Sequence, residues 1–218
     1  MEGRITSIER QKGDKSRASI FLEEEFAFGL NDQTVEQFRL RKGDYVDPEL
    51  HGKIVDFDYW VDAKRIALAY LSYRARSEKE IRDRLKREDI PEEMIARVVA
   101  FLGENGLVDD GAWSKAFVND KLHRKPVSAR QLEYGLLQKG VAKEVIEQTI
   151  SELNATETDE DRALQAAQKR WGRIVRSETD PRKQKQKLYT FLAGRGFDFE
   201  VIERVYTNLA REDTREDE

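Results

Sequence analysis

The apolar positions of this 218-residue chain repeat one spacing three times. In each copy, three large apolar residues follow one another at intervals of five. These residues are Leu85, Ile90 and Ile95 in the first copy, Leu136, Val141 and Ile146 in the second, and Leu192, Phe197 and Ile202 in the third. The copies are 51 and then 56 residues apart. Such a period is longer than that of the two-helix repeats of about 34 residues.

Each copy also begins with the same kind of helix start. A capping side chain stands before the apolar positions, followed by a residue suited to the first helical turn. The pairs are Ser77 with Glu80, Ser128 with Gln131, and Asp180 with Pro181. In the third copy the cap lies twelve residues before Leu192 rather than eight. This difference predicts a middle helix that is longer by about one turn.

A further apolar helix is predicted before each start, in residues 62–74, 109–124 and 160–175. The chain therefore contains three copies of a three-helix unit, which we expect over residues 62–109, 110–156 and 157–210. One such unit is too small for a good core, so we expect neighbouring units to stack and share apolar surface.

The first part of the chain reads as β-rich. Residues 4–11 and 17–24 flank the turn-like segment 12–15 and predict a hairpin. In residues 25–31, Phe26, Phe28 and Leu30 alternate and are expected on one face of a strand. A short helix should follow, capped by Asn31 or Asp32 and ending before Gly43, and Asp47 before Pro48 should start another. We expect an N-terminal extension over 1–46 and a connecting helix over 47–61.

The net charge of −4 conceals an uneven distribution. Residues 211–218 are mostly acidic and are expected to form a disordered tail. Between Arg162 and Phe197 there are ten basic residues and only two acidic ones, Glu178 and Asp180. Local charge governs the binding of polyanions more than the total does. Without cysteines, a membrane-length apolar run or an apolar leader, the sequence predicts a cytoplasmic protein with no membrane partner.

Few residues are arranged for catalysis. Asp109 and Asp110 could form a metal-dependent nuclease pair, but we favour a structural interpretation in which Gly106 ends one helix and Asp110 caps the next. His51 and His123 match no zinc or triad spacing, and no phosphate-binding loop motif is present. We therefore expect no catalytic residue, metal or cofactor.

Basic residues are the strongest candidates for function. The second residue after each cap is basic, and so is the junction just before the cap. The candidates are Arg74, Arg76, Lys79, Arg82, Arg124, Lys125, Arg130, Arg176, Arg182 and Lys183. If the units stack, equivalent positions should form a basic track suited to a phosphate backbone or an acidic protein surface. The alternative is that these cations are merely solvated residues of a highly charged protein.

The chain resembles the RecX family. The resemblance rests on residues 67–85, 107–122 and 136–146 and covers about residues 63–209; residues 21–44 also resemble the N-terminal extension of some members. It implies a mainly α protein in which three tandem three-helix repeats form an elongated, curved array after the β-rich extension. It also implies a monomeric, non-enzymatic negative regulator of the RecA recombinase. Such a regulator binds RecA and the RecA–DNA filament, and suppresses ATP hydrolysis, strand exchange and co-protease activity in recombination and the SOS response. A charge-driven DNA-binding module without a RecA partner is the alternative.

Overall fold

The computed structural model describes residues 2–216, apart from the side chains of Lys169 and of residues 212–216. The chain forms two compact units. The first contains residues 1–76 and 81–108, and the second contains residues 77–80 and 109–218. Each unit is described by itself below.

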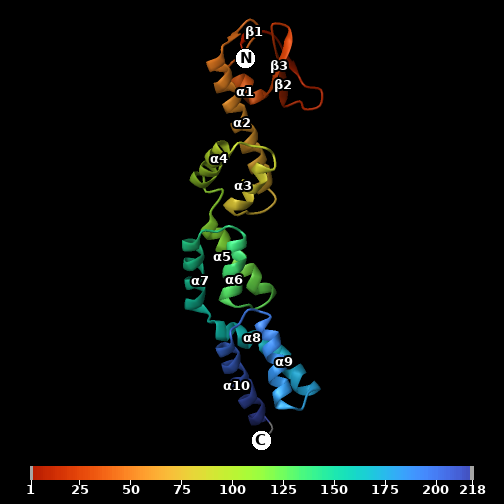
Figure 1. Ribbon diagram of the computed structural model, residues 1–218, viewed down its shortest axis with the longest axis vertical. Coiled ribbons are helices and arrows are strands. Elements are labelled where there is room, and N and C mark those ends of the chain that lie inside the picture. Colours follow the sequence, from red (N-terminus) through yellow and green to blue (C-terminus); the bar gives the residue numbers. More distant parts are fainter. Residues whose placement is uncertain (1, 217–218) are drawn as a thin grey trace. The chain divides into compact units, whose positions relative to one another are not determined.

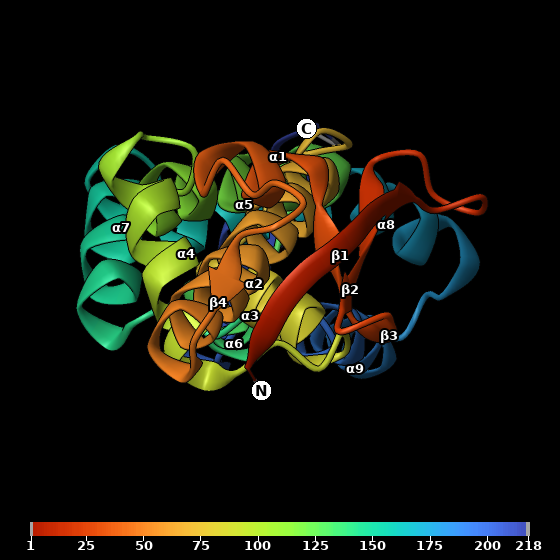
Figure 2. The ribbon, with the colours of Figure 1, turned by 90° about the horizontal axis from the view of Figure 1, so that it is seen from above.

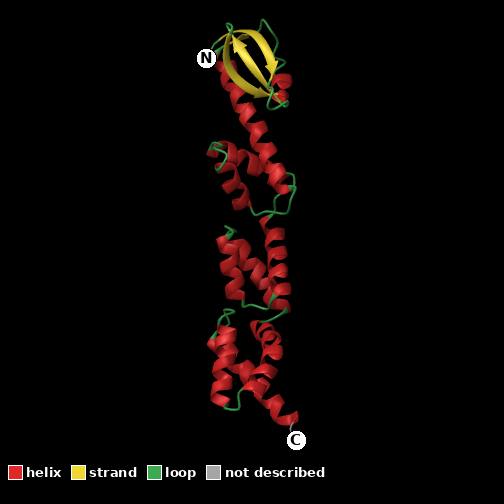
Figure 3. Ribbon diagram, turned by 90° about the vertical axis from the view of Figure 1, so that its right-hand side faces the viewer, coloured by secondary structure: helices red, strands yellow, loops and turns green. Residues whose placement is uncertain are grey.

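The first unit begins with an antiparallel sheet, as the hairpin pattern predicted (Figures 2 and 3). Its strands are β1 (Gly3–Arg10), β2 (Arg17–Leu22), β3 (Glu25–Asn31) and the short β4 (Tyr45–Val46), in the order β3-β2-β1-β4. Ala18, Ile20 and Leu22 alternate toward the core, as a sheet with one buried face requires. The sheet therefore has one apolar face available for packing against helices.

The alternation predicted for the third strand is wrong at Phe26. Ile20 pairs with Phe28, but Phe21 pairs with Phe26, so Ala27 is an extra residue on β3. Because a β-bulge shifts the alternation by one residue, Phe26 lies on the outer face, where its ring packs edge-on against Phe21 and remains 61% exposed. Leu30, beyond the bulge, is buried as predicted.

Two helices complete this part of the unit. α1 (Asp32–Gln37) starts at Asn31 as predicted, but it ends earlier than the Gly43 signal indicated, since Arg39 already has a left-handed φ of 51°. α2 (Pro48–Leu71) starts at Asp47, whose side chain accepts the Leu50 N–H at 2.7 Å. It is one continuous helix, which joins the predicted connecting helix to the first helix of the first repeat.

A buried carboxylate attaches α2 to the end of the sheet. Asp58 Oδ1 accepts hydrogen bonds from the Asn31 backbone N–H, the Asn31 side chain and the Thr34 hydroxyl, at 2.7, 3.0 and 2.6 Å. Its second oxygen lies 3.4 Å from the Arg17 guanidinium. Several partners on one buried charge compensate its desolvation. The β-rich part thus packs on the N-terminal half of α2.

The remaining helices form the three predicted triplets (Figure 1). The first triplet consists of the C-terminal half of α2, α3 (Glu78–Lys86) and α4 (Glu92–Glu104). The second consists of α5 (Asp110–Arg124), α6 (Ala129–Gln138) and α7 (Lys143–Thr156). The third consists of α8 (Asp159–Ser177), α9 (Pro181–Ala193) and α10 (Phe199–Glu216). α9 has 13 residues against 9 for α3 and 10 for α6, which confirms the longer third middle helix.

The repeated apolar positions are the centres of the three cores. All nine are at most 8% exposed, and those that end the middle helices, Leu85, Leu136 and Leu192, are completely buried. Each triplet has its own apolar cluster. The spacing of five places one residue at the end of the middle helix, one in the turn and one on the third helix.

The C-terminal helix differs from the expected acidic tail. α10 continues to Glu216, so it includes most of the segment 211–218 for which disorder was expected, while residues 217 and 218 lie outside the described residues. The chain has no glycine or proline after Gly196 that would end the helix earlier.

We expect Leu136→Ala to lower the free energy of unfolding by roughly 2–5 kcal/mol, because it leaves a cavity at a completely buried site. Urea denaturation followed by circular dichroism measures this loss. Leu137→Ala is the matched control, because the neighbouring Leu137 is 59% exposed. Equal losses in both variants would contradict the assigned core.

Candidate functional site

The starts of the middle helices are capped as the sequence predicted, with one difference. At α3 the box is reciprocal: the Glu80 N–H donates to Ser77 Oγ at 3.3 Å, and the Ser77 N–H donates to the Glu80 carboxylate at 3.4 Å. At α6 the Gln131 N–H donates to Ser128 Oγ at 3.2 Å, but the Ser128 N–H donates to the Arg195 carbonyl at 3.1 Å. The second cap is therefore completed by the third repeat.

Each of these two starts also takes an acceptor from the next repeat. The Glu78 N–H, at the first position of α3, donates to Asp110 Oδ1 at 2.8 Å. The Ala129 N–H, at the first position of α6, donates to Asp159 Oδ1 at 2.8 Å. Both acceptors are the first residue of the following triplet. We call each such contact a joint; both joints lie within the second unit, which includes residues 77–80.

Glycines complete the joints. The residue before the second repeated apolar position has a left-handed backbone in every copy, with φ of 54° at Asp89, 72° at Gly140 and 85° at Gly196. A Cβ on Gly140 would lie 2.2 Å from the Lys79 side chain, and one on Gly196 would lie 2.5 Å from Ser128 Oγ. Glycine is therefore required both by the conformation and by the close approach of the preceding helix start.

The paired acids have structural partners, but their roles differ from the predicted ones. Asp109, not Asp110, caps α5 and accepts the Gly111 and Ala112 N–H groups at 2.8 and 3.0 Å. Asp110 is the acceptor of the first joint. The sequence of α5 alone indicated a cap but gave no reason to assign the second acid to another helix.

Burial raises the pKa of the Asp110 carboxyl, and repulsion from Glu78 and Asp109 acts in the same direction. The Glu78 N–H opposes this shift by donating to the carboxylate. In the second joint, the guanidinium of the completely buried Arg162 also donates a hydrogen bond to the Asp159 carboxylate, at 2.6 Å. Arg162, part of the basic segment seen in the sequence, is therefore a structural residue.

The predicted cations differ in accessibility. Eight of them are exposed, and Arg76 and Arg82 are half-buried. The guanidinium of Arg76 lies 3.9 Å from the Tyr70 ring centroid, and that of Arg82 lies 3.4 Å from Glu92. The exposed cations are Arg74, Lys79, Arg124, Lys125, Arg130, Arg176, Arg182 and Lys183.

Three of the exposed cations share one local position. Lys79, Arg130 and Arg182 are each the second residue of a middle helix. Lys79 packs its stem against Gly140, and Arg130 lines a hollow of about 360 Å³ beside the turn at Gly196. Arg74, Arg76 and Arg82 belong to the other unit. A continuous track through all ten cations stays a prediction.

The described residues contain no group of three His, Cys, Asp or Glu side chains that could hold a metal ion. His51 packs edge-on against Phe28 with ring centroids 5.1 Å apart, and burial lowers its pKa. No helix among residues 2–216 is long and apolar enough to span a membrane.

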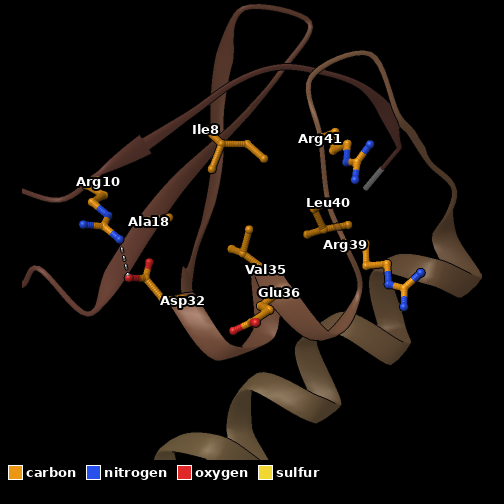
Figure 4. A pocket seen from close by; sticks show the side chains of 9 residues that line it. All are labelled: Ile8, Arg10, Ala18, Asp32, Val35, Glu36, Arg39, Leu40 and Arg41. Atoms are coloured by element: carbon orange, nitrogen blue, oxygen red, sulfur yellow. Dashed lines mark ion pairs between the residues drawn. The ribbon is translucent and has the colours of Figure 1, made fainter.

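The N-terminal part contains a hollow of about 560 Å³ that no sequence pattern predicted (Figure 4). Ile8, Val35 and Leu40 form its apolar floor, and Arg39 and Arg41 stand at one side. At the other side Arg10 forms an ion pair with Asp32 at 3.4 Å. Charges of both signs at its edge do not define one class of ligand.

The fold defines a class of proteins built from tandem three-helix repeats that follow a small β-rich domain, and the comparisons identify the family. Family models match four segments: the RecX N-terminal domain at residues 3–47, and the first, second and third RecX three-helix domains at residues 63–102, 109–150 and 157–206. The chain belongs to the RecX family, and it shares that family's regulatory role.

Relatives of known sequence and structure agree. The regulatory protein RecX of Clostridium beijerinckii is 32% identical over 93% of both chains, and that of Clostridium acetobutylicum is 30% identical over 97% of this chain and 98% of the relative. A crystal structure of regulatory protein RecX is 29% identical, with a TM-score of 0.69 over 93% of this chain and 98% of that one. RecX from Lactobacillus salivarius, 23% identical, shares the fold with a TM-score of 0.63 over 70% of this chain and 97% of its own.

We expect Gly196→Ala to lower the thermal unfolding midpoint. A left-handed alanine costs about 1–2 kcal/mol, and its Cβ also collides with the short Ser128 side chain. Gly172→Ala within α8 is the control, since its Cβ would meet only the end of Arg176 at 3.8 Å and should stabilise the helix by about 0.5–1 kcal/mol. Differential scanning calorimetry of both variants should give shifts of opposite sign; shifts of the same sign would contradict the second joint.

Asp110→Asn should change how stability depends on pH. A raised folded-state pKa means that the contribution of Asp110 is fully present below its unfolded-state pKa and is lost as pH rises through the raised value. Asparagine keeps a neutral acceptor for the Glu78 N–H and does not titrate. We therefore expect the urea midpoint of the variant to rise relative to wild type between acidic and neutral pH.

The matched variant Asp110→Ala removes the acceptor and should destabilise the protein by roughly 1–3 kcal/mol at every pH. A midpoint difference between Asp110→Asn and wild type that does not vary with pH would contradict the raised pKa.

Proposed function

We propose that this protein is a negative regulator of the RecA recombinase that acts by binding rather than by catalysis. It binds RecA and the RecA–DNA filament, and it inhibits ATP hydrolysis, strand exchange and co-protease activity in recombination and the SOS response. The family membership supports this role, and so does the exposed cation at the second position of each middle helix. We also propose that the protein acts as a monomer in the cytoplasm.

The position of these cations carries the argument. A cation in the first turn interacts unfavourably with the helix dipole, so Lys79, Arg130 and Arg182 do not help their helices form. Their side chains are exposed, so they are accessible to an acidic protein surface or to phosphates. Placing one such cation on each successive repeat suits a partner that is itself repetitive, as a filament is.

The test is RecA ATPase activity on single-stranded DNA, titrated with this protein. Arg76 is left unchanged in the test variant, because its guanidinium stacks on the Tyr70 ring. The variant Lys79→Glu, Arg130→Glu, Arg182→Glu changes the exposed second residue of each middle helix. We expect its half-inhibitory concentration to rise at least about tenfold, a loss of about 1.4 kcal/mol in binding.

The matched control is Lys53→Glu, Lys115→Glu, Lys143→Glu. It makes the same change in net charge at exposed surface ion pairs, which contribute little to stability. We expect it to inhibit RecA like the wild type. Equal loss in both variants, with helicity unchanged by circular dichroism, would refute the specific role of these positions.

The same assay distinguishes a RecA regulator from the alternative, a charge-driven DNA-binding module. Such a module should inhibit only where it saturates the DNA, with an affinity that falls linearly with the logarithm of salt concentration. A RecA regulator should inhibit at concentrations well below that of RecA, under salt conditions where it binds bare DNA weakly. Inhibition only at DNA-saturating concentrations would favour the module.

A further inference from the structure

The third repeat contains a hollow lined by basic and polar side chains. It has a volume of about 540 Å³ and lies along α8 and α9, which pack side by side (Figure 1). Its lining residues are Arg170, Lys183, Gln186, Lys187, Thr190 and Phe191. None of these six residues is acidic, and three are cations.

A fourth cation, Arg195, contacts the Phe191 ring that lines this hollow. The guanidinium groups of Arg170 and Arg195 lie 5.5 and 3.9 Å from the Phe191 ring centroid. Burial lowers the pKa of Arg195, and the charge of Arg170 acts in the same direction. The Arg195 Nε atom is buried without a hydrogen-bond partner among the described residues. Two like charges are therefore held on one aromatic ring, an arrangement that a nearby anion would stabilise.

One carboxylate lies at the edge of the cluster. Glu178 pairs with Lys187 at 3.2 Å, and this hydrogen bond is the main reason why the pKa of the Glu178 carboxyl is lowered. Arg170 and Lys183 are exposed and face the hollow with polar neighbours, Gln186 and Thr190. The local excess of positive charge therefore remains after this ion pair is counted.

We propose that this hollow, on α8 and α9 of the third repeat, is a binding site for phosphate groups. Lys183 and Lys187 are one turn apart on α9, so they lie side by side, and Arg170 reaches the hollow from α8. A phosphate presents several oxygens that can be shared between a planar guanidinium and lysine ammonium groups. The source of the phosphate is a single-stranded nucleic acid or a small polyphosphate, both of which present this chemistry.

The proposal does not depend on RecA, so it is tested without RecA. Fluorescence anisotropy of a labelled fifteen-residue oligothymidylate measures strand binding by the full-length protein at several salt concentrations. The variant Arg170→Gln, Lys183→Gln should bind about tenfold more weakly. Its salt slope should fall by about 0.7 for each lost phosphate contact.

The control is Arg173→Gln, Lys143→Gln, which makes the same change in net charge. Arg173 is exposed on α8, one turn from Arg170, but does not line the hollow, and Lys143 is on α7. We expect this control to bind the oligonucleotide like the wild type. Equal weakening in both variants would show a diffuse charge effect and overturn the site.

A second measurement uses sodium tripolyphosphate and the NMR resonance of the Arg195 Nε group. A saturable shift in the wild type and the control, but not in the hollow variant, supports the phosphate site. If oligothymidylate causes the same shift, a strand is a competent source; if only tripolyphosphate does, the site takes a small polyphosphate. No shift with either compound overturns the proposal, while RecA inhibition is left to its own assay.

Discussion

The arrangement of the second unit depends on how the first N–H groups of the middle helices are satisfied. The first turn of an α-helix leaves backbone donors without partners inside the helix. In α3 and α6 one such donor is satisfied by a carboxylate from the next repeat, Asp110 or Asp159, each at 2.8 Å. Apolar contacts alone tolerate sliding, whereas a hydrogen bond between one particular donor and one particular acceptor fixes how the two helix ends that it joins meet.

The carboxylates that accept these bonds also lower the electrostatic cost of the exposed cations. Asp110, Asp159 and, in the last copy, Asp180 each accept an N–H from the first turn of a middle helix. An acceptor carboxylate compensates the positive end of the helix dipole. The cation at the second position then costs less than it would at a helix start without such an acid. The candidate interaction surface and the joints are therefore parts of one arrangement.

Much of this fold could be predicted because its signals are local. Cap residues, apolar intervals and the four extra residues before Leu192 each act within one helix or turn, and the triplets follow from them. The bulge at Ala27 was not predictable, because it arises from the pairing of two strands. The predicted role of Asp110 as the cap of α5 was wrong for a similar reason, because its partner, the Glu78 N–H, lies on another helix. Aligned glycines at Gly140 and Gly196 were a signal for the joints, since the first copy has Asp89 there, where no preceding three-helix repeat exists.

The two joints differ in how the charge of the acceptor carboxylate is compensated. Three residues after Asp159 stands Arg162, which is completely buried and also donates to Asn154 at 2.9 Å, so the charge of the acceptor is compensated inside the joint. Three residues after Asp110 stands Trp113, which stacks on Phe117 and cannot neutralise a carboxylate. A buried ion pair adds little net stability but is costly to break. The second joint therefore holds its register through charge, whereas the first holds it through one hydrogen bond to an acid whose ionisation burial opposes.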